Sequence, residues 1–242
     1  MNADIIVALL TLTAMEIVLG IDNIVFIAIL VSKLPQELQE KARRLGISLA
    51  LIFRLGLLFS ISWVMGLTKP LFEVFGQAFS GRDMILLVGG MFLIAKATYE
   101  IHEKLDSGPT EKELQASVKS KFGAVLTQIL LIDLVFSLDS VITAVGMAQQ
   151  VWIMVVAMVV SVVVMLISAS AISRFVENHP TIKILALSFL ILIGVMLLVE
   201  GMGGHMSKAY VYFAMAFSLF VEMINIRYRK KHDPVALRKS KY

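Results

Sequence analysis

The stretch MEIVLGIDN (residues 15–23) places two carboxylates, Glu16 and Asp22, in an otherwise apolar run. A second stretch, IDLVFSLDS (residues 132–140), repeats the pattern 117 positions later, with its two acids again six positions apart. Each copy lies near the middle of a run long enough to cross a bilayer, where one ionised side chain costs roughly 2.5–3.5 kcal/mol. The four acids therefore require fixed counter-charges, protonation or a bound cation.

The composition indicates an integral membrane protein. Of the 242 residues, 58% are hydrophobic, whereas soluble domains are about 45–50% apolar. Cysteine is absent, which excludes disulfides and thiolate metal sites. The net charge of +4 comes from basic residues in loops and at the C-terminus. We interpret them as membrane-topology signals, with no nucleic acid as a partner.

Seven apolar segments predict an all-α membrane protein with seven transmembrane helices. They cover residues 3–32, 43–67, 84–101, 122–149, 151–173, 183–203 and 207–226. Three spans separate the two motif helices, so the motifs cross the membrane in opposite directions, as in two inverted three-helix repeats plus one extra helix. The predicted parts are a first repeat (1–101), a cytoplasmic linker (102–121), a second repeat (122–203), a seventh span (204–226) and a basic cytoplasmic tail (227–242).

The distribution of basic residues predicts the orientation. Seventeen Lys and Arg residues fall in the loops of one side and in the tail, against only Lys69, Arg82 and Lys208 on the other side. By the positive-inside rule, we expect the N-terminus outside and the C-terminus in the cytoplasm.

The spacing within the motifs predicts broken helices. On a continuous helix Glu16 and Asn23 share a face, whereas Asp22 lies about 120° away. Convergence of both acids therefore needs a break, which Gly20 in the first motif and Ser137 in the second could supply. Half-helix ends beside carboxylates would form a cation site built of oxygen atoms.

The side chains of the motifs indicate which ion such a site would hold. Carboxylate, amide and hydroxyl oxygens suit Mn²⁺, Ca²⁺ or Mg²⁺ and not softer metals. No pattern indicates an organic cofactor. The predicted metal ligands are Glu16, Asp22, Asn23, Asp133, Asp139 and Ser140.

The competing interpretation is a static polar core in which Arg54 and Lys96 neutralise two of the acids. Two cations inside the spans cannot balance all of the buried acids, and intramembrane acids are functional candidates by default. Arg54 is equally compatible with a role in the ion site and with a structural ion pair. Lys96 lies four positions before Glu100, which favours a local helical pair. Glu222 and Asn225 fit either an ion vestibule or an interfacial position.

The two motifs resemble those of the TerC family of bacterial inner-membrane proteins, in particular its YgdQ-like branch, which is related to manganese exporters. The resemblance continues through the segments RRLGISLALIFRLGLL, GGMFLIAKATYEIHE, ENHPTIKILALSFLILIG and YVYFAMAFSLFVEMIN. It implies seven transmembrane helices and, for several members, export of Mn²⁺. It also implies that the acids of the motifs, with Asn23 and Ser140, form the ion site. Other members are linked with tellurium resistance or with metal supply to exported proteins.

The sequence thus predicts a multi-pass transporter of the bacterial inner membrane that exports a hard divalent cation, with Mn²⁺ as the first candidate. Its predicted partners are membrane lipids and the ion. One alternative is a membrane scaffold that binds partner proteins and keeps its buried acids in structural ion pairs. Another is a transporter of a tellurium species or an amino acid. Neither a Walker loop nor a G-x-S-x-G elbow occurs, and we do not expect an enzyme.

Overall fold

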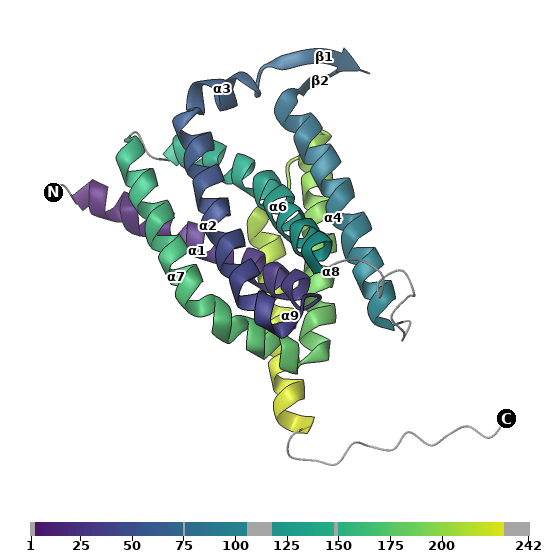
Figure 1. Cartoon of the computed structure of the whole chain (residues 1–242). Coiled ribbons are helices and arrows are strands. Elements are labelled where there is room, and N and C mark those ends of the chain that lie inside the picture. Colours follow the sequence, from purple (N-terminus) through teal and green to yellow (C-terminus); the bar gives the residue numbers. More distant parts are fainter. Residues whose placement is uncertain (1–2, 75, 106–117, 148–149, 230–242) are drawn as a thin grey trace. The chain divides into compact units, whose positions relative to one another are not determined.

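The computed structural model describes residues 3–74, 76–105, 118–147 and 150–229, which form eight helices and one β-hairpin (Figure 1). The helices are α1 (Ala3–Val31), α2 (Gln36–Phe59), α3 (Ile61–Gly66), α4 (Gly81–Leu105), α6 (Val118–Met147), α7 (Val151–Asn178), α8 (Pro180–Gly201) and α9 (Lys208–Arg229). The chain divides into two compact units, Met1–Met206 and Ser207–Tyr242. The first unit contains both motifs.

Six of the described helices, namely α1, α4, α6, α7, α8 and α9, are long and apolar enough to cross a membrane. The prediction of seven spans is therefore not confirmed. The missing one is α2, whose 24 residues include Arg43, Arg44 and Arg54. Its apolar part is also shorter than the expected segment 43–67, because α2 ends at Phe59 and the separate short helix α3 follows.

The motif helices α1 and α6 are continuous, so the predicted breaks at Gly20 and Ser137 are wrong. Gly20 has a different role, which is to let α1 approach α7. A Cβ atom at Gly20 would lie 2.4 Å from Sδ of Met165 on α7. A missing side chain thus serves close helix packing, as is common in membranes, without interrupting the helix.

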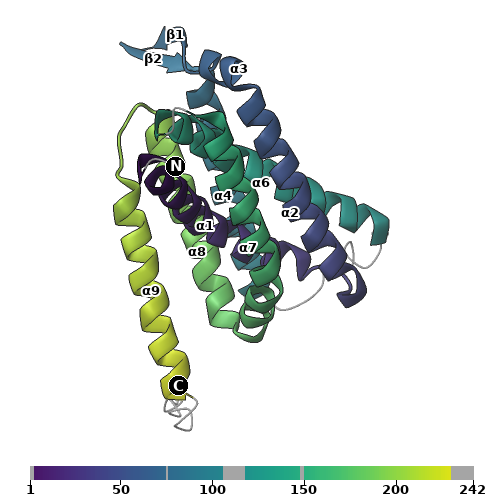
Figure 2. The same ribbon diagram turned by 90° about the vertical axis from the view of Figure 1, so that its left-hand side faces the viewer.

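The first unit is held together by helix pairs that join its two halves. The most extensive contacts are between α1 and α7, between α4 and α8, and between α2 and α6, and they can be followed in Figures 1 and 2. Where α4 crosses α8, a Cβ on Gly90 would lie 2.7 Å from the Gly194 carbonyl oxygen, and one on Gly194 2.9 Å from that of Gly90. Gly90 and Gly194 thus allow the two helix backbones to approach closely.

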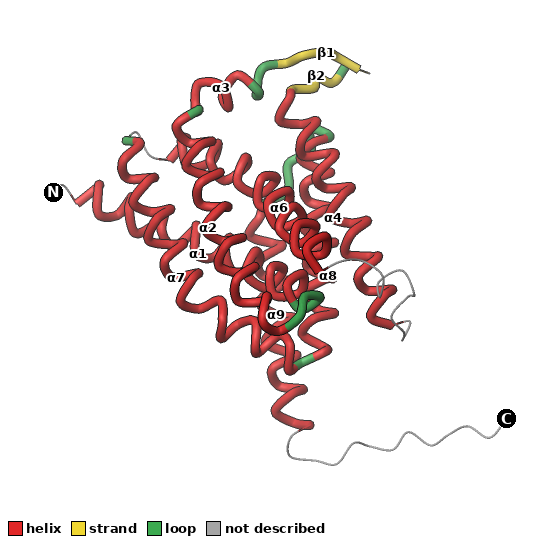
Figure 3. The backbone as a smooth tube through the Cα atoms, viewed as in Figure 1, coloured by secondary structure: helices red, strands yellow, loops and turns green. Residues whose placement is uncertain are grey.

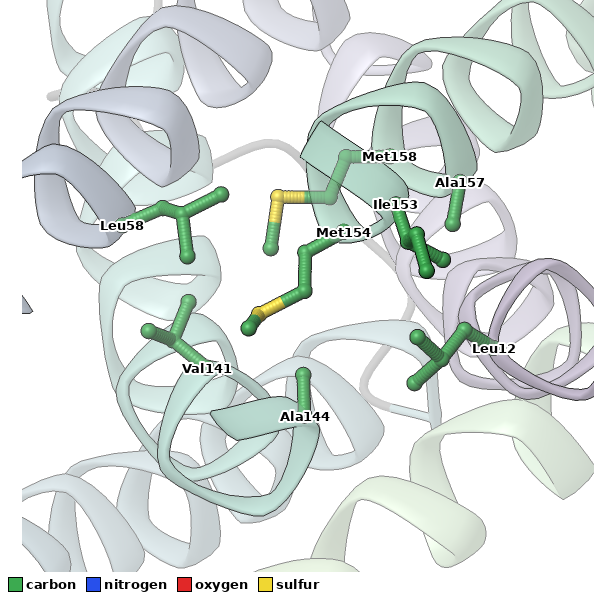
Figure 4. Packing of buried hydrophobic residues seen from close by; sticks show 8 residues of the cluster. All are labelled: Leu12, Leu58, Val141, Ala144, Ile153, Met154, Ala157 and Met158. Atoms are coloured by element: carbon green, nitrogen blue, oxygen red, sulfur yellow. The ribbon is translucent and has the colours of Figure 1, made fainter. Parts of the chain in front are cut away.

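A cluster of buried apolar residues joins α1, α2, α6 and α7 (Figure 4). Met154 and Met158 of α7 lie in its middle, and the other members are Leu12, Leu58, Val141, Ala144, Ile153 and Ala157. Leu12 lies one turn before Glu16 on α1, and Leu58 lies one turn after Arg54 on α2. The cluster therefore packs about one helical turn away from Glu16 and Arg54.

A two-stranded antiparallel hairpin connects α3 to α4, which the sequence interpretation missed (yellow in Figure 3). Its strands are β1 (Pro70–Val74) and β2 (Gln77–Ser80). Gly76 at the turn has a φ of 78°, a conformation that glycine adopts without strain. The rings of Phe72 and Phe79 stack at 5.7 Å, and the Gln77 amide donates a hydrogen bond to the Met202 carbonyl.

The second unit is described only through α9, whose side chains are mostly exposed. The tail from residue 230 lies outside the described residues, as does most of the predicted linker 102–121. Of that linker, residues 102–105 end α4 and residues 118–121 begin α6.

Candidate ion site between the two repeated motifs

Arg54 of α2 links the first acids of the two motifs. Its Nη1 donates a hydrogen bond to Glu16 Oε2 at 2.8 Å, and its Nη2 donates to Asp133 Oδ1 at 2.6 Å. Its Nε lies 3.1 Å from the same Asp133 oxygen. All three side chains are buried, with exposed fractions of 3% for Arg54, 4% for Glu16 and 5% for Asp133. One guanidinium thus compensates two carboxylates, which leaves a formal charge of −1.

The charge balance at Arg54 differs from the one expected from the sequence. Arg54 was expected to balance one acid at most, whereas its fork of N–H donors reaches one acid from each half. Guanidinium groups suit such sharing because several donors lie in one plane. The interpretation of Arg54 as an ion-pair partner is therefore supported for both Glu16 and Asp133.

Asn23 adds a polar group to the same place. Its Nδ2 donates a hydrogen bond to Asp133 Oδ1 at 3.3 Å. Its Oδ1 is buried and has no hydrogen-bond partner among the described residues. A buried acceptor without a partner costs free energy, and here it belongs to a side chain that contacts the Asp133 carboxylate. Its chemistry is that of a ligand for a hard cation.

The hydroxyl groups of the second motif bond within their own helix. Ser140 Oγ donates to the Ser137 carbonyl at 3.2 Å, and Ser137 Oγ donates to the Leu134 carbonyl at 3.2 Å. Such bonds are the usual way to satisfy a serine in an apolar helix. The structure does not bring Ser140 to the group around Arg54.

The second acid of the second motif meets a different arginine. Arg82 Nη2 lies 2.6 Å from Asp139 Oδ1 and 3.4 Å from Glu200 Oε2 on α8. Sequence reasoning placed Arg82 in a loop and missed this role, because α4 begins earlier than predicted, at Gly81.

A local signal could have located that helix start. The Ser80 N–H donates to Asp83 Oδ2 at 2.9 Å, and the Asp83 N–H donates to Ser80 Oγ at 3.3 Å. This reciprocal pair is a capping box, which marks the first turn of a helix. It would have placed Arg82 inside α4 and not in a flanking loop.

Asp22, the second acid of the first motif, differs from the other three. It is half-buried, and no hydrogen bond or ion pair to it is found among the described residues. The four motif acids therefore do not meet at one point. Within the described ranges, no group of three or more His, Cys, Asp or Glu side chains is arranged to hold a metal ion.

A further ion-pair group lies at the other end of α4. Lys96 Nζ is 2.7 Å from Glu100 Oε1, so the predicted local pair is confirmed. Lys33, just after α1, is 2.9 Å from the same oxygen and 2.6 Å from Glu103 Oε2. Burial lowers the pKa of the Lys33 ammonium, but its hydrogen bonds to Glu103 and Glu100 outweigh burial, and the pKa is raised above its usual value.

The remaining predicted residues lie on α9. Asn225 Nδ2 donates a hydrogen bond to Glu222 Oε2 at 3.3 Å, one turn away on the same helix. This local bond fits either of the two roles considered for them.

The helices and the buried charges define a multi-pass integral membrane protein with ion pairs shared between two repeated motifs. The chain matches the family described as "Integral membrane protein TerC family" over residues 1–233, and it belongs to that family.

Several relatives match nearly the whole chain. It is 52% identical to a UPF0053 protein of Haemophilus influenzae, covering 93% of this chain and 94% of the relative. Identity is also 52% to the Escherichia coli UPF0053 inner membrane protein YgdQ, with the same coverage. The UPF0053 inner membrane protein YoaE of E. coli is 52% identical as well, but the match spans only 43% of its length. No solved structure matches the chain.

Proposed function

We propose that the protein is an inner-membrane transporter that exports a hard divalent cation, with Mn²⁺ as the first candidate. One observation carries this proposal. Glu16 of the first motif and Asp133 of the second contact the same buried guanidinium. Carboxylates from both halves therefore surround a single position for positive charge.

In the proposed cycle, the transported ion replaces the guanidinium. Glu16, Asp133 and the unpaired Asn23 Oδ1 offer oxygen ligands, which Mn²⁺, Ca²⁺ and Mg²⁺ prefer. Two carboxylates balance a divalent cation fully, whereas Arg54 leaves one negative charge. Arg54 would then act as a tethered competitor that stabilises the ion-free state. Asp22, which has no counter-charge among the described residues, would attract the incoming ion.

The pattern of helix contacts supports two inverted halves. In two related halves, α1 corresponds to α6, α2 to α7 and α4 to α8. The contact between α1 and α7 then corresponds to the contact between α6 and α2, and the contact between α4 and α8 corresponds to itself. All of these pairs are extensive contacts. Two related halves can rock against each other around a central site, which is the usual basis of alternating access. The proposal includes α2 as a seventh span, and an odd number of spans places the N-terminus outside and the C-terminus in the cytoplasm.

The test is Mn²⁺ flux into proteoliposomes that contain an Mn²⁺-quenched dye. We expect uptake with the wild-type protein, and at least a tenfold slower rate with Asp22→Asn and with Asp133→Asn. Glu37→Gln, a change at the exposed start of α2, is the matched control and should transport like the wild type. Equal rates for all four proteins, or no flux with the wild type, would contradict the proposal.

A second candidate is a membrane scaffold, which the ion pairs themselves favour. Arg54 compensates Glu16 and Asp133, and Arg82 pairs with Asp139. A scaffold with these structural pairs needs no ion. A ligand that binds only the folded state raises its unfolding temperature, so the absence of any Mn²⁺-dependent shift, together with absent flux, would favour the scaffold.

A further inference from the structure

A second polar site lies outside both motifs, between the first turns of α2 and the last turns of α7. It is a cavity of about 400 Å³, within the size range of ligand pockets. Every side chain that lines it is polar or charged, in contrast to the lipid-facing surface of most of the helices. The residues that matter below are Glu40, Arg43, Ser170, Ser173, Arg174 and Glu177.

The inner wall of this cavity is built from buried groups. Arg43 is 7% exposed, and its Nη2 donates hydrogen bonds to Glu40 Oε2 at 2.8 Å and to Ser170 Oγ at 2.9 Å. Ser173 is 2% exposed, and its Oγ has no hydrogen-bond partner among the described residues. A buried hydroxyl left unpaired beside a polar cavity indicates a missing polar partner.

The outer wall offers free charge of both signs. Arg174 is exposed and Glu177 is half-buried, and neither has an ion pair or a side-chain hydrogen bond within the described part of the chain. Glu40, by contrast, is already occupied, since Arg43 and Arg44 both contact it. The cavity therefore presents one available guanidinium, one available carboxylate and one available hydroxyl group. That set complements a ligand that carries a phosphate and a primary ammonium group.

We propose that this cavity binds the phosphoethanolamine headgroup of a membrane phospholipid. Arg174 and the Ser173 hydroxyl would hold the phosphate, and Glu177 would accept hydrogen bonds from the ammonium group. The cavity lies at the ends of two helices, where headgroups meet a membrane protein. The proposal is independent of ion transport.

The surface beside the cavity favours a lipid over a soluble metabolite. Val163 and Ile167 lie seven residues before Ser170 and Arg174 on α7, so they share its cavity face. Both are exposed, at 49% and 76%. They provide an apolar track for an acyl chain that runs from the cavity toward the middle of the helix.

The experiment measures lipid binding to the purified full chain by native mass spectrometry in detergent. The probes are phosphatidylethanolamine, phosphatidylglycerol, which lacks the ammonium group, phosphatidylcholine, whose ammonium cannot donate hydrogen bonds, and soluble glycerophosphoethanolamine. The variants are Arg174→Gln and Glu177→Gln. Lys41→Gln, which removes an exposed charge from α2 outside the cavity, is the matched control.

We expect phosphatidylethanolamine to bind best and each cavity variant to lose roughly tenfold in affinity for it, the size of one charged hydrogen bond. Lys41→Gln should bind like the wild type. Glu177→Gln should weaken the binding of phosphatidylethanolamine but not the binding of phosphatidylglycerol. Equal binding of all three lipids, unchanged binding in both cavity variants, or equally tight binding of glycerophosphoethanolamine would overturn the proposal.

Discussion

Asp22 and Asp139 occupy the same position in the two copies of the motif, but their surroundings differ. Asp139 lies 2.6 Å from an Arg82 nitrogen, whereas Asp22 has no polar partner among the described residues. Glu16 and Asp133, the first acids of the two motifs, differ from both, because they share one arginine, Arg54. The motif is therefore repeated in sequence, but its compensation by positive charge is not.

The difference arises because the two arginines belong to unrepeated positions. The residues that lie 117 positions after Arg54 and Arg82 are Ala171 and Val199, which carry no charge. Arg82 compensates an acid of the second half, whereas no basic side chain of the described residues compensates Asp22 in the first half. The two halves therefore compensate their acids differently in the same structure. Under the proposed function, Asp22 is the motif acid that attracts the cation.

Removing the shared arginine should have the largest effect. Arg54→Gln leaves Glu16 and Asp133 buried without a counter-charge, and breaking such a pair costs about 3–5 kcal/mol. We expect a loss of that size in the free energy of unfolding, measured with denaturant in detergent. If Arg54 occupies the ion position, Mn²⁺ should stabilise this variant more than the wild type.

Two further variants serve as controls for Arg54→Gln. Arg54→Lys keeps the positive charge but loses the planar fork of N–H donors. Its free energy of unfolding should lie between those of Arg54→Gln and the wild type. Arg44→Gln removes an exposed arginine of the same helix, 72% exposed in its pair with Glu40, and should cost about 0.5 kcal/mol or less. Wild-type stability in Arg54→Gln would refute the compensating role.

Neutralising the second acids should have effects of opposite sign. Asp139→Asn deprives Arg82 of its nearest carboxylate, although Glu200 remains at 3.4 Å, and should cost about 1–2 kcal/mol. Asp22→Asn removes a half-buried charge that has no partner and should be neutral or stabilise the fold by up to about 1 kcal/mol. Unfolding midpoints of both variants, measured side by side, check this. Equal destabilisation would show that Asp22 is compensated in solution.

The small residues of the two motifs should show the smallest difference. Gly20→Ala brings a Cβ to 2.4 Å from Met165 Sδ, so the methionine must move, at a cost of about 1 kcal/mol. Ser137→Ala loses only a bond to its own helix and should cost less than about 0.5 kcal/mol. A double variant, Gly20→Ala with Met165→Val, should recover part of the loss in a double-mutant cycle. Strict additivity would mean that the two residues do not press on each other.

Local sequence patterns predicted much of the fold. The spans follow from runs of apolar residues, and the Lys96–Glu100 pair follows from their spacing on one helix. The close approach of α4 to α8 at Gly90 and Gly194 was not predicted, because it depends on which two helices pack together. The continuity of α1 and α6 was not foreseen, because Gly20 can either break a helix or pack closely, and only the position of Met165 separates these roles.

The candidate site was predictable only in part. The repeated acids stand out because charge is rare in an apolar run, but their partners are distant in sequence: Arg54 is 79 positions from Asp133, and Arg82 is 57 positions from Asp139. Neither distance is encoded by hydropathy or helical periodicity.

The sequence alone identifies a helical membrane protein with two related pairs of acids in its spans, because apolar runs and the charges within them are visible residue by residue. Which of these acids are compensated depends on the three-dimensional structure, since Arg54 reaches Glu16 and Asp133 only after α2 has packed against α1 and α6. Helix docking depends on close side-chain fit across the whole interface, and this docking brings Arg82 to Asp139.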